Sequence, residues 1–393
     1  MTSTDLPQGV TSNTISLLLG HPDPATLLPS ELHDAMQHVI DSPQAYTALQ
    51  YGPEHGAQSL VDVLVEKINR EQGLSIQASN LMVVAGSTHA VDMLTRLYAK
   101  PGGVVLVEAP TYADAIHIFR DHQVELYSIP MDDDGLITSA LEKQLAELHA
   151  SGKSPRMLYT IPNFHNPTGR TLSEVRRLEL IRLARYYGFL IVEDDVYHDL
   201  PFEGVVPPSL YALANGEQVV SIGSFSKTLA PGLRLGWLLG SEDAIRPCLS
   251  CGTTQMGGGA NPFTAHMVAE YCRRGYWEKH IAYVRSLYKT RRDIALSALE
   301  QYMPSDVKWT HPAGGFFIWL TLPEDVFAQD VRRLALQEGL AVASGEGFFL
   351  QPSDGSLHLR LAYSRAAYND IDTGIRILAR VIDRARKISG NSD

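Results

Sequence analysis

The sequence has little cysteine and no long apolar run, and both absences narrow the class of protein. Its three cysteines offer no disulfide framework, which fits a reducing cytoplasm. No uninterrupted apolar stretch approaches the ~18 residues that span a bilayer. The N-terminal residues also lack the basic start of a signal peptide. We therefore expect a cytoplasmic protein without a membrane partner.

Runs of positive charge are absent as well. The formal net charge is -11 and no segment is rich in lysine or arginine, which argues against nucleic acid as a partner. The chain has 393 residues, of which 45% are hydrophobic. Because single cores stop growing near ~250–300 residues, this length predicts one large core and a second, smaller one.

One cysteine pair has the spacing of a possible redox or zinc site. Cys248 and Cys251 form a CxxC in "RPCLSCGT". A redox site would need the pair after a strand, and a zinc site would need a second ligand pair. Neither is visible, so we interpret them as ordinary thiols on one helical turn and expect no metal site.

Short apolar runs with helical patterns between them dominate the first part of the chain. Most of the runs are continuous rather than alternating, which is typical of strands buried on both faces. Between them lie amphipathic segments such as residues 172–187, with Ser173 as N-cap and Gly188 as C-terminal stop. This alternation predicts a mostly parallel sheet with helices on both sides. The seven runs are 81–86, 104–110, 124–130, 157–162, 189–195, 219–226 and 233–240.

The pattern changes after about residue 260. Asn261-Pro262 has the form of a helix start and opens a helical region that we expect to reach about Tyr302. An α+β pattern follows, with strands at 314–322 and 357–363, a helix at 326–339 and a last helix from Asn369. We predict a large domain over residues 46–285 and a small C-terminal domain over 286–393. Residues 1–45 are predicted to form an N-terminal arm and part of the small domain.

In open α/β sheets, ligands bind beyond the carboxyl ends of the strands. Polar and aromatic residues follow the predicted strands at that edge: Ser87, Thr88, Tyr112, Asn166, Asp194, Tyr197, Ser224, Ser226 and Lys227. In "SIGSFSKTLAPGLRLGW", Arg234 comes seven residues after Lys227 and no carboxylate is present. Two cations that close need a shared anion, and we infer that this anion is a cofactor phosphate.

These residues suit one ligand, an aromatic aldehyde that carries a phosphate and a ring nitrogen. A helix N-terminus at Ser87 and Thr88, with Ser224, Ser226 and Arg234 opposite, would bind the phosphate. Tyr112 could stack on the ring, Asp194 could pair with a protonated ring nitrogen, and Asn166 and Tyr197 could bond a phenolic oxygen. Lys227, partly desolvated and close to cations, would have a lowered pKa and act as a Schiff-base nucleophile. Pyridoxal phosphate (PLP) needs these partners.

Each feature alone has an ordinary structural explanation. Ser87-Thr88 could be a plain N-cap, the Asn166–Gly169 segment a β-turn, Tyr112 a core residue, and Lys227 a surface lysine. All of these explanations would have to hold together at successive strand ends, which makes them improbable.

Several motifs resemble the class I/II aminotransferases of PLP fold type I over essentially the whole chain: "YGPEHG" from Tyr51, "NPTG" from Asn166, "DDVY" from Asp194, "SFSKTLAPGLRLGW" from Ser224 and "LRLAYS" from Leu359. "QYGPEHG", "GGFFIWL" and "GEGFF" are similar to the branch with 2-aminoadipate and kynurenine aminotransferases. The resemblance implies an α/β fold, with a large domain built on a mostly parallel seven-stranded sheet flanked by helices and a smaller α+β domain.

The resemblance also implies roles for single residues. Lys227 would form the internal aldimine and move the proton, with Asp194 and Tyr197 as the other catalytic residues. Tyr51 would reach the phosphate of the neighbouring subunit, which makes a homodimer with shared active sites part of the expectation. Arg360, Asn166 and Gly20, the last in the loop "LLLGHPDP", would bind the substrate. The polar His21 in this loop is expected to be an exposed residue, with a role in substrate specificity as the alternative, and His165 could pack near the cofactor.

The resemblance implies a PLP-dependent aminotransferase that moves an amino group from an L-amino acid to a 2-oxo acid, 2-oxoglutarate, by a ping-pong mechanism. A PLP-dependent decarboxylase, lyase or oxidative deaminase would share the fold and cofactor motifs. A non-enzymatic PLP-sensing regulator is a remote alternative, since it would need ~70 further N-terminal residues with a recognition helix. Choice of side chain is expected to lie with residues 17–28, Tyr51 of the partner subunit and Phe348-Phe349.

Overall fold

The computed structural model describes residues 14–27, 30–43 and 45–389. All seven predicted strands lie in one sheet, and an additional two-residue strand, β5 (Gly135–Leu136), extends its edge. The strand order is β2-β9-β8-β7-β6-β3-β4-β5. The bounds are β2 Leu81–Val84, β3 Val104–Ala109, β4 Glu125–Asp132, β6 Pro155–Thr160, β7 Leu190–Asp194, β8 Val219–Ser224 and β9 Gly236–Leu239.

The centre of this sheet is parallel. Strands β4, β3, β6, β7 and β8 pair in parallel, whereas β9 runs antiparallel to both of its neighbours and β5 antiparallel to β4. Alternate residues of each strand enter different cores, as Leu106 and Val107 show. Burial on both faces explains why the runs are continuously apolar, as predicted.

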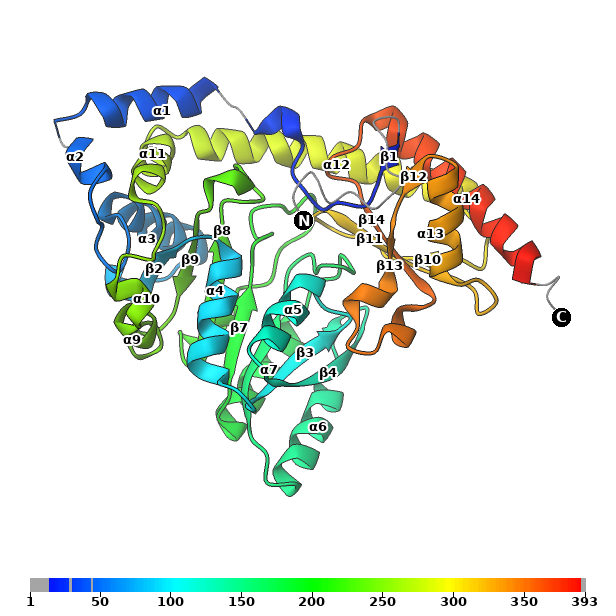
Figure 1. Cartoon of the computed structure of the whole chain (residues 1–393), viewed down its shortest axis with the longest axis horizontal. Coiled ribbons are helices and arrows are strands. Elements are labelled where there is room, and N and C mark those ends of the chain that lie inside the picture. The colour runs from blue at the N-terminus through cyan, green and yellow to red at the C-terminus, as the bar shows by residue number, and fades with distance from the viewer. Residues whose placement is uncertain (1–13, 28–29, 44, 390–393) are drawn as a thin grey trace.

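Helices cover both faces of the sheet (Figure 1). Helix α7 (Glu174–Tyr187) confirms the predicted bounds, with Ser173 as N-cap and a left-handed Gly188 at its end. The other helices of this part are α3 (Gln58–Gln72), α4 (Ser87–Leu94), α5 (Ala113–Asp121), α6 (Thr138–Ala150), α8 (Leu210–Ala214), α9 (Glu242–Ser250), α10 (Gly252–Gln255) and α11 (Pro262–Arg273), preceded by α1 (Ser30–Asp41) and α2 (Ala45–Ala48).

The predicted helical region after residue 260 is divided in two. The Asn261 side chain accepts a hydrogen bond from the Thr264 amide and caps α11, as its sequence position predicts. Gly275, with φ of 68°, then separates α11 from α12 (Tyr276–Tyr302). Figure 1 shows α12 running along the top of the molecule, above both sheets.

A second, antiparallel sheet has the order β10-β11-β14-β13. Its strands are β10 (Lys308–Trp309), β11 (Phe317–Thr321), β13 (Ala343–Ser344) and β14 (His358–Ala362), and it packs with α12, α13 (Ala328–Gln337) and α14 (Tyr368–Ser389). The N-terminal strand β1 (Ile15–Ser16) pairs in parallel with β12 (Leu340–Ala341). Helix α12 continues across position 285, and the domain boundaries at 45/46 and 285/286 stay predictions.

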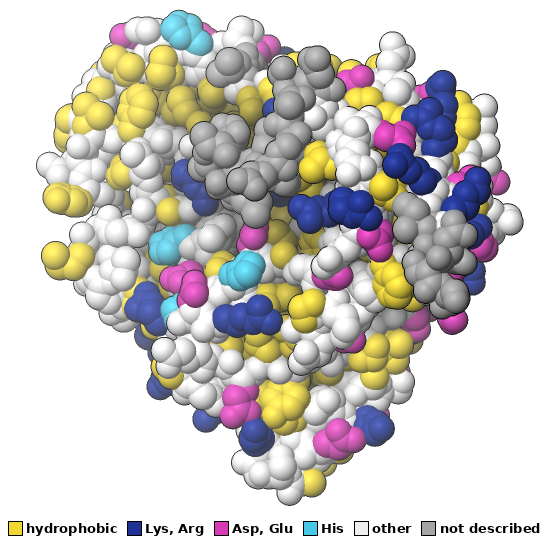
Figure 2. Space-filling model, turned by 45° about the vertical axis from the view of Figure 1, so that its right-hand side comes forward, with side chains coloured by type: hydrophobic (Ala, Val, Ile, Leu, Met, Phe, Trp, Pro, Cys, Tyr) yellow, Lys and Arg dark blue, Asp and Glu magenta, His cyan; other side chains and the backbone are white. Residues whose placement is uncertain are grey.

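The surface carries charges of both signs. Figure 2 shows lysine and arginine side chains interspersed with aspartate and glutamate over the face in view. Within the described residues no helix is long and apolar enough to cross a membrane.

Candidate active site

The predicted site residues gather at the carboxyl ends of the parallel strands. Asp194 is the last residue of β7 and Ser224 the last of β8, with Lys227 in the turn that follows. Asn166 lies in the turn after β6. Because parallel strands end at one edge of the sheet, these residues approach one another from three neighbouring strands.

Asp194 is a buried carboxylate with one oxygen engaged and one open. Its Oδ2 accepts a hydrogen bond of 2.5 Å from the Tyr159 hydroxyl. Its Oδ1 is buried without a hydrogen-bond partner among the described residues. Burial raises the pKa of Asp194 to about 6, although the Tyr159 hydrogen bond and the Lys227 charge act in the opposite direction. An open, buried acceptor of this kind calls for a protonated ligand atom.

Lys227 is held beside this carboxylate in a partly buried position. Its Nζ lies 3.4 Å from the Gly20 carbonyl oxygen and 5.8 Å from the ring centre of Tyr197. Burial lowers the pKa of Lys227 to about 8; Asp194 raises it and Arg360 lowers it further. The structure therefore agrees with the predicted direction, and the amine is neutral in a larger fraction of molecules than an exposed lysine.

The N-terminus of α4 and Arg234 form a possible anion site. Gly86 precedes the helix with φ of 90°, and a Cβ atom there would lie 2.7 Å from Nη2 of Arg234. The same Nη2 donates to the Ala85 carbonyl oxygen over 3.3 Å. The guanidinium thus rests against the first turn of α4, where free amides and the helix dipole favour an anion.

The predicted serines lie at the strand end that approaches the first turn of α4. Gly236 pairs with Ser224 in β8, and a Cβ atom on Gly236 would lie 3.2 Å from the Ser87 amide nitrogen. Ser224 and Ser226 are buried, with the Ser226 amide donating to Ser224 Oγ over 3.0 Å. Thr88 is exposed in the first turn of α4.

Two tyrosines border the space around Asp194. Tyr112 immediately precedes α5 and donates to Asp114 Oδ2 over 2.6 Å; burial raises the pKa of its phenol well above the usual value. Tyr197 is buried against the rings of Phe316 and Phe317, whose centres lie 5.6 and 5.9 Å from its own. Burial likewise raises the pKa of Tyr197, so both phenols are protonated.

Arg360 is a buried cation that forms no ion pair with a carboxylate among the described residues. Its guanidinium lies between the rings of Phe317 and Phe348, 4.5 and 4.8 Å from their centres. Nη1 donates to Asn166 Oδ1 over 3.0 Å and Nη2 to the Leu18 carbonyl oxygen over 2.7 Å, while Nε has no partner among the described residues. Burial lowers the pKa of Arg360 to about 10. This arrangement suits a ligand carboxylate.

Gly20 lies in close contact with this group. A Cβ atom on Gly20 would lie 2.3 Å from Cζ of Phe317. Its neighbour His21 is exposed, as expected. His165 is buried, with Nε2 3.0 Å from Glu108 Oε2. Leu28, the end of the expected specificity segment, lies outside the described residues.

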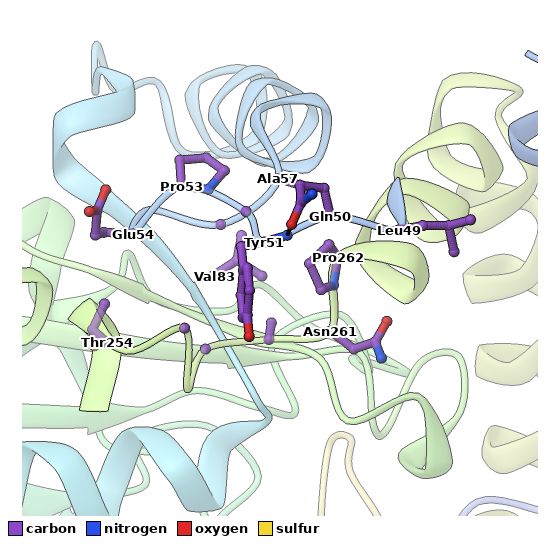
Figure 3. A pocket seen from close by; sticks show the side chains of 15 residues that line it. Leu49, Gln50, Tyr51, Pro53, Glu54, Ala57, Val83, Thr254, Asn261 and Pro262 are labelled. Carbon is purple, nitrogen blue, oxygen red and sulfur yellow. Dashed lines mark hydrogen bonds between the residues drawn. The ribbon is translucent and has the colours of Figure 1, made fainter. Parts of the chain in front are cut away.

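Tyr51 is a predicted site residue that lies away from Lys227 and Asp194 within this single chain. It is 81% exposed and lines a different pocket of about 600 Å³. Figure 3 shows its side chain directed across that pocket toward the segment between Thr254 and Asn261. No hydrogen bond or ring contact among the described residues links Tyr51 to Lys227 or Asp194.

Sequence reasoning missed Tyr159 and the ring of Phe317 beside Arg360; Phe348 was expected to select the substrate side chain, but its contact with Arg360 was not foreseen. Tyr159 belongs to an apolar strand, "PRMLYT", and has the pattern of a core residue. The available signal was the alternation of side chains between the two faces of a strand. Tyr159 and Asp194 lie near the ends of β6 and β7, which are neighbours in the parallel sheet, and their side chains point to the same face.

Comparison with known proteins identifies the family. Residues 14–372 match the model described as aminotransferase class I and II, and the chain belongs to this family. It is 37% identical over 377 residues to aromatic-amino-acid aminotransferase 1 of Thermococcus litoralis, covering 96% of this chain and 90% of the relative. It is also 33% identical to an uncharacterised HTH-type transcriptional regulator of Bacillus subtilis, covering 86% of this chain and 68% of that protein.

Solved structures support the same fold. Kynurenine aminotransferase of Pyrococcus horikoshii, in complex with PMP, superposes with a TM-score of 0.90 at 38% identity, covering 95% of this chain and 92% of that one. LysN, the alpha-aminoadipate aminotransferase of Thermus thermophilus, complexed with N-(5'-phosphopyridoxyl)-L-leucine, gives 0.86 at 29% identity, covering 96% and 94%. The expected family and branch are confirmed, and the chain is an enzyme of the transaminase type with PLP fold type I.

Proposed function

We propose that this enzyme transfers the amino group of an L-amino acid to a 2-oxo acid, with 2-oxoglutarate as acceptor, by a PLP-dependent ping-pong mechanism. The observation that carries the proposal is the pair formed by Lys227, an amine with a lowered pKa, and Asp194, a buried carboxylate with an open Oδ1. The residues present fit PLP, because amine, acid, anion site and aromatic rings meet at one sheet edge. PLP when bound supplies an aldehyde and an aromatic system that accepts electrons from the substrate α-carbon.

Each residue then has a defined task. Lys227 would hold the cofactor covalently through Nζ, and its neutral amine would take and return the substrate α-proton. Asp194 Oδ1 keeps the proton on the ring nitrogen. Asn166 and Tyr197 orient the ring oxygen, and Tyr112 excludes water from one ring face. The phosphate is bound by Ser87, Thr88, Ser224, Ser226 and Arg234.

Arg360 binds the substrate α-carboxylate in this proposal, beside Asn166 and Gly20. The surrounding side chains are apolar: Trp319 and Phe348 pack together with Leu18 and Phe349. A buried guanidinium with aromatic walls favours amino acids with apolar or aromatic side chains as donors.

We also propose a homodimer. Large hydrophobic side chains are exposed around the pocket of Tyr51, including Leu49 at 78% and Met256 at 84%. A second copy that covers them would let Tyr51 reach the phosphate in the partner's site. Light scattering after gel filtration should give twice the mass of the chain, and Leu49→Asp should give monomers with weakened PLP binding.

The decisive test of the proposed reaction is Lys227→Ala. The wild type should be yellow, form pyridoxamine phosphate with an amino donor alone, and need a 2-oxo acid in stoichiometric amount for turnover. Lys227→Ala should lose the covalent chromophore and all turnover. Turnover without a 2-oxo acid would favour the decarboxylase, lyase or oxidative deaminase alternative.

A panel of amino donors measured against 2-oxoglutarate and pyruvate would identify the donor and the acceptor. Steady turnover in this panel is also the property that a non-enzymatic PLP-sensing regulator, the remote alternative from the sequence, would lack. The cytoplasmic location and the lack of nucleic-acid and membrane partners stay predictions from composition.

A further inference from the structure

We propose that Tyr159 is a positioning residue for the reaction: its hydroxyl holds Asp194 Oδ2 so that Oδ1 alone faces the cofactor. This inference rests on the proposed function. Tyr159 Oη donates to Oδ2 over 2.5 Å, and no other hydrogen bond to the Asp194 carboxylate occurs among the described residues. Oδ2 is therefore held by the protein, and Oδ1 is left free for a ligand.

The sheet itself brings the two side chains together. In the parallel pairing of β6 and β7, Tyr159 lies opposite Val192. Asp194 is two residues beyond Val192, so it points to the same face as Tyr159. Diagonal neighbours of this kind are within reach of a long aromatic side chain. The Tyr159 side chain therefore reaches from β6 to the Asp194 carboxylate on β7.

Packing fixes the donor. Tyr159 is fully buried, and its ring meets Phe119 edge to face with centres 5.5 Å apart. Burial, together with the neighbouring Asp194 charge, raises the pKa of the Tyr159 phenol well above its usual value. The hydroxyl consequently remains a donor throughout the working pH range and cannot become a second anion beside Asp194.

The hydrogen bond also sets the charge of Asp194. Burial disfavours the ionised carboxylate, and the charges of Asp195 and Glu108 raise its pKa further. The hydrogen bond from Tyr159 and the charge of Lys227 lower it. Tyr112 and Tyr197 also face this space, and both are neutral because burial raises their pKa values. Tyr159 is therefore the neutral donor that keeps Asp194 ionised.

The test compares Tyr159→Phe with wild-type holoenzyme. Phenylalanine keeps the ring and its contact with Phe119 but removes the donor. A hydrogen bond to a charged group is typically equivalent to about one to two pKa units, so the acid limb of the kcat profile should move up by about that amount. The pH at which the visible cofactor band changes in the resting enzyme should move with it. KM for the amino donor should change little, because Arg360 is untouched.

A matched control is Tyr98→Phe, which loses a partly buried phenol hydrogen bond of 2.6 Å to the Ala244 carbonyl oxygen, away from the site. It should leave the pH profile and the visible band as in the wild type. Equal profiles for Tyr159→Phe and wild type would overturn the inference, as would an equal shift in both variants. If Tyr159→Phe does not fold, fluorinated tyrosine at this position, a stronger donor, should move the acid limb to lower pH, and an unmoved limb would overturn the inference.

A cofactor-free readout separates this inference from the proposed function. In apoprotein with ¹³C-labelled aspartate, the Asp194 carboxyl should titrate at higher pH in Tyr159→Phe than in the wild type. If the protein lacks transaminase activity but still shows this difference, the proposed function is wrong and the role of Tyr159 toward Asp194 stands. If the enzyme is active but the Asp194 titration is unchanged in Tyr159→Phe, the proposed function stands and the inference about Tyr159 is wrong.

Discussion

Arg360 Nη1 donates to Asn166 Oδ1 over 3.0 Å, and this hydrogen bond joins the four-stranded sheet to the turn that follows β6 of the large sheet. In the proposed function, Asn166 contacts the cofactor and Arg360 the substrate carboxylate. The bond therefore couples the position of the substrate to the position of the ring.

Arg360→Lys should show whether substrate binding depends on the positive charge of Arg360 or on the geometry of its guanidinium group. Lysine keeps the positive charge but loses the planar fork that bonds a carboxylate and Asn166 together. We expect kcat/KM to fall about 10²–10³-fold, with KM raised for donor and acceptor alike. Steady-state kinetics check this, and Arg376→Lys on the surface of α14 serves as control. An unchanged KM for both substrates would contradict the proposed role of Arg360.

Gly86→Ala should weaken cofactor binding. A methyl group there would lie 2.7 Å from Arg234 Nη2 and push the guanidinium away from α4. We expect PLP affinity to fall about tenfold, measured by fluorescence titration of apoprotein. Gly73→Ala is the matched control, because Gly73 also has positive φ (64°) but open space around it. Gly73→Ala should lose about 1–2 kcal/mol of stability from its left-handed backbone. Gly86→Ala should lose more, because Gly86 has φ of 90° and ψ of 166°, a region that essentially only glycine adopts, and only this variant should lose PLP affinity.

Asp194→Asn should make the apoprotein more stable while abolishing efficient turnover. Burial raises the pKa of Asp194 to about 6, so folding favours the protonated form. Stability is therefore lost as pH rises from about 4 to about 6, and the full cost of about 3 kcal/mol is present at pH 8. Asparagine removes this cost. Urea unfolding should show the gain at pH 8 and almost none at pH 4; a gain that does not depend on pH would contradict the assignment.

Capture of PLP by the apoprotein should follow the neutral fraction of Lys227. Burial lowers the pKa of this amine to about 8. Below that pH the rate constant should fall about tenfold per unit, and above it the rate should level off. Stopped-flow absorbance measures this rate constant. The reaction of PLP with n-butylamine is the reference, because the reactivity of an exposed amine with a pKa of about 10.4 still rises well beyond pH 9. A rate still rising between pH 9 and 10 would contradict a lowered pKa.

Much of the fold could be predicted because its signals are local. Seven buried runs, the cap at Asn261 and the stop at Gly188 each depend on a few neighbouring residues. The pairing of Ile15 with Leu340 and the two-residue strand β5 were not foreseen. Such short strands carry too few residues for a period to show, and their partners are chosen by packing of distant segments.

Part of the candidate site could likewise be predicted from the sequence, and part could not. Lys227, Asp194 and Asn166 follow strand ends, and a parallel sheet collects strand ends at one edge, so their meeting follows from the order of elements. Tyr51 lies in another pocket of this chain, and its predicted contact needs a second copy.

By itself, the sequence determined which residue types stand at which strand ends and which strands are buried on both faces, because alternation and turn chemistry act over a few residues. Only the tertiary structure decided that Tyr159 binds one oxygen of Asp194, that Arg360 is enclosed by Phe317 and Phe348, and that Gly86 admits Arg234. Those contacts join residues far apart in the chain, and their distances depend on how whole elements pack rather than on any local pattern.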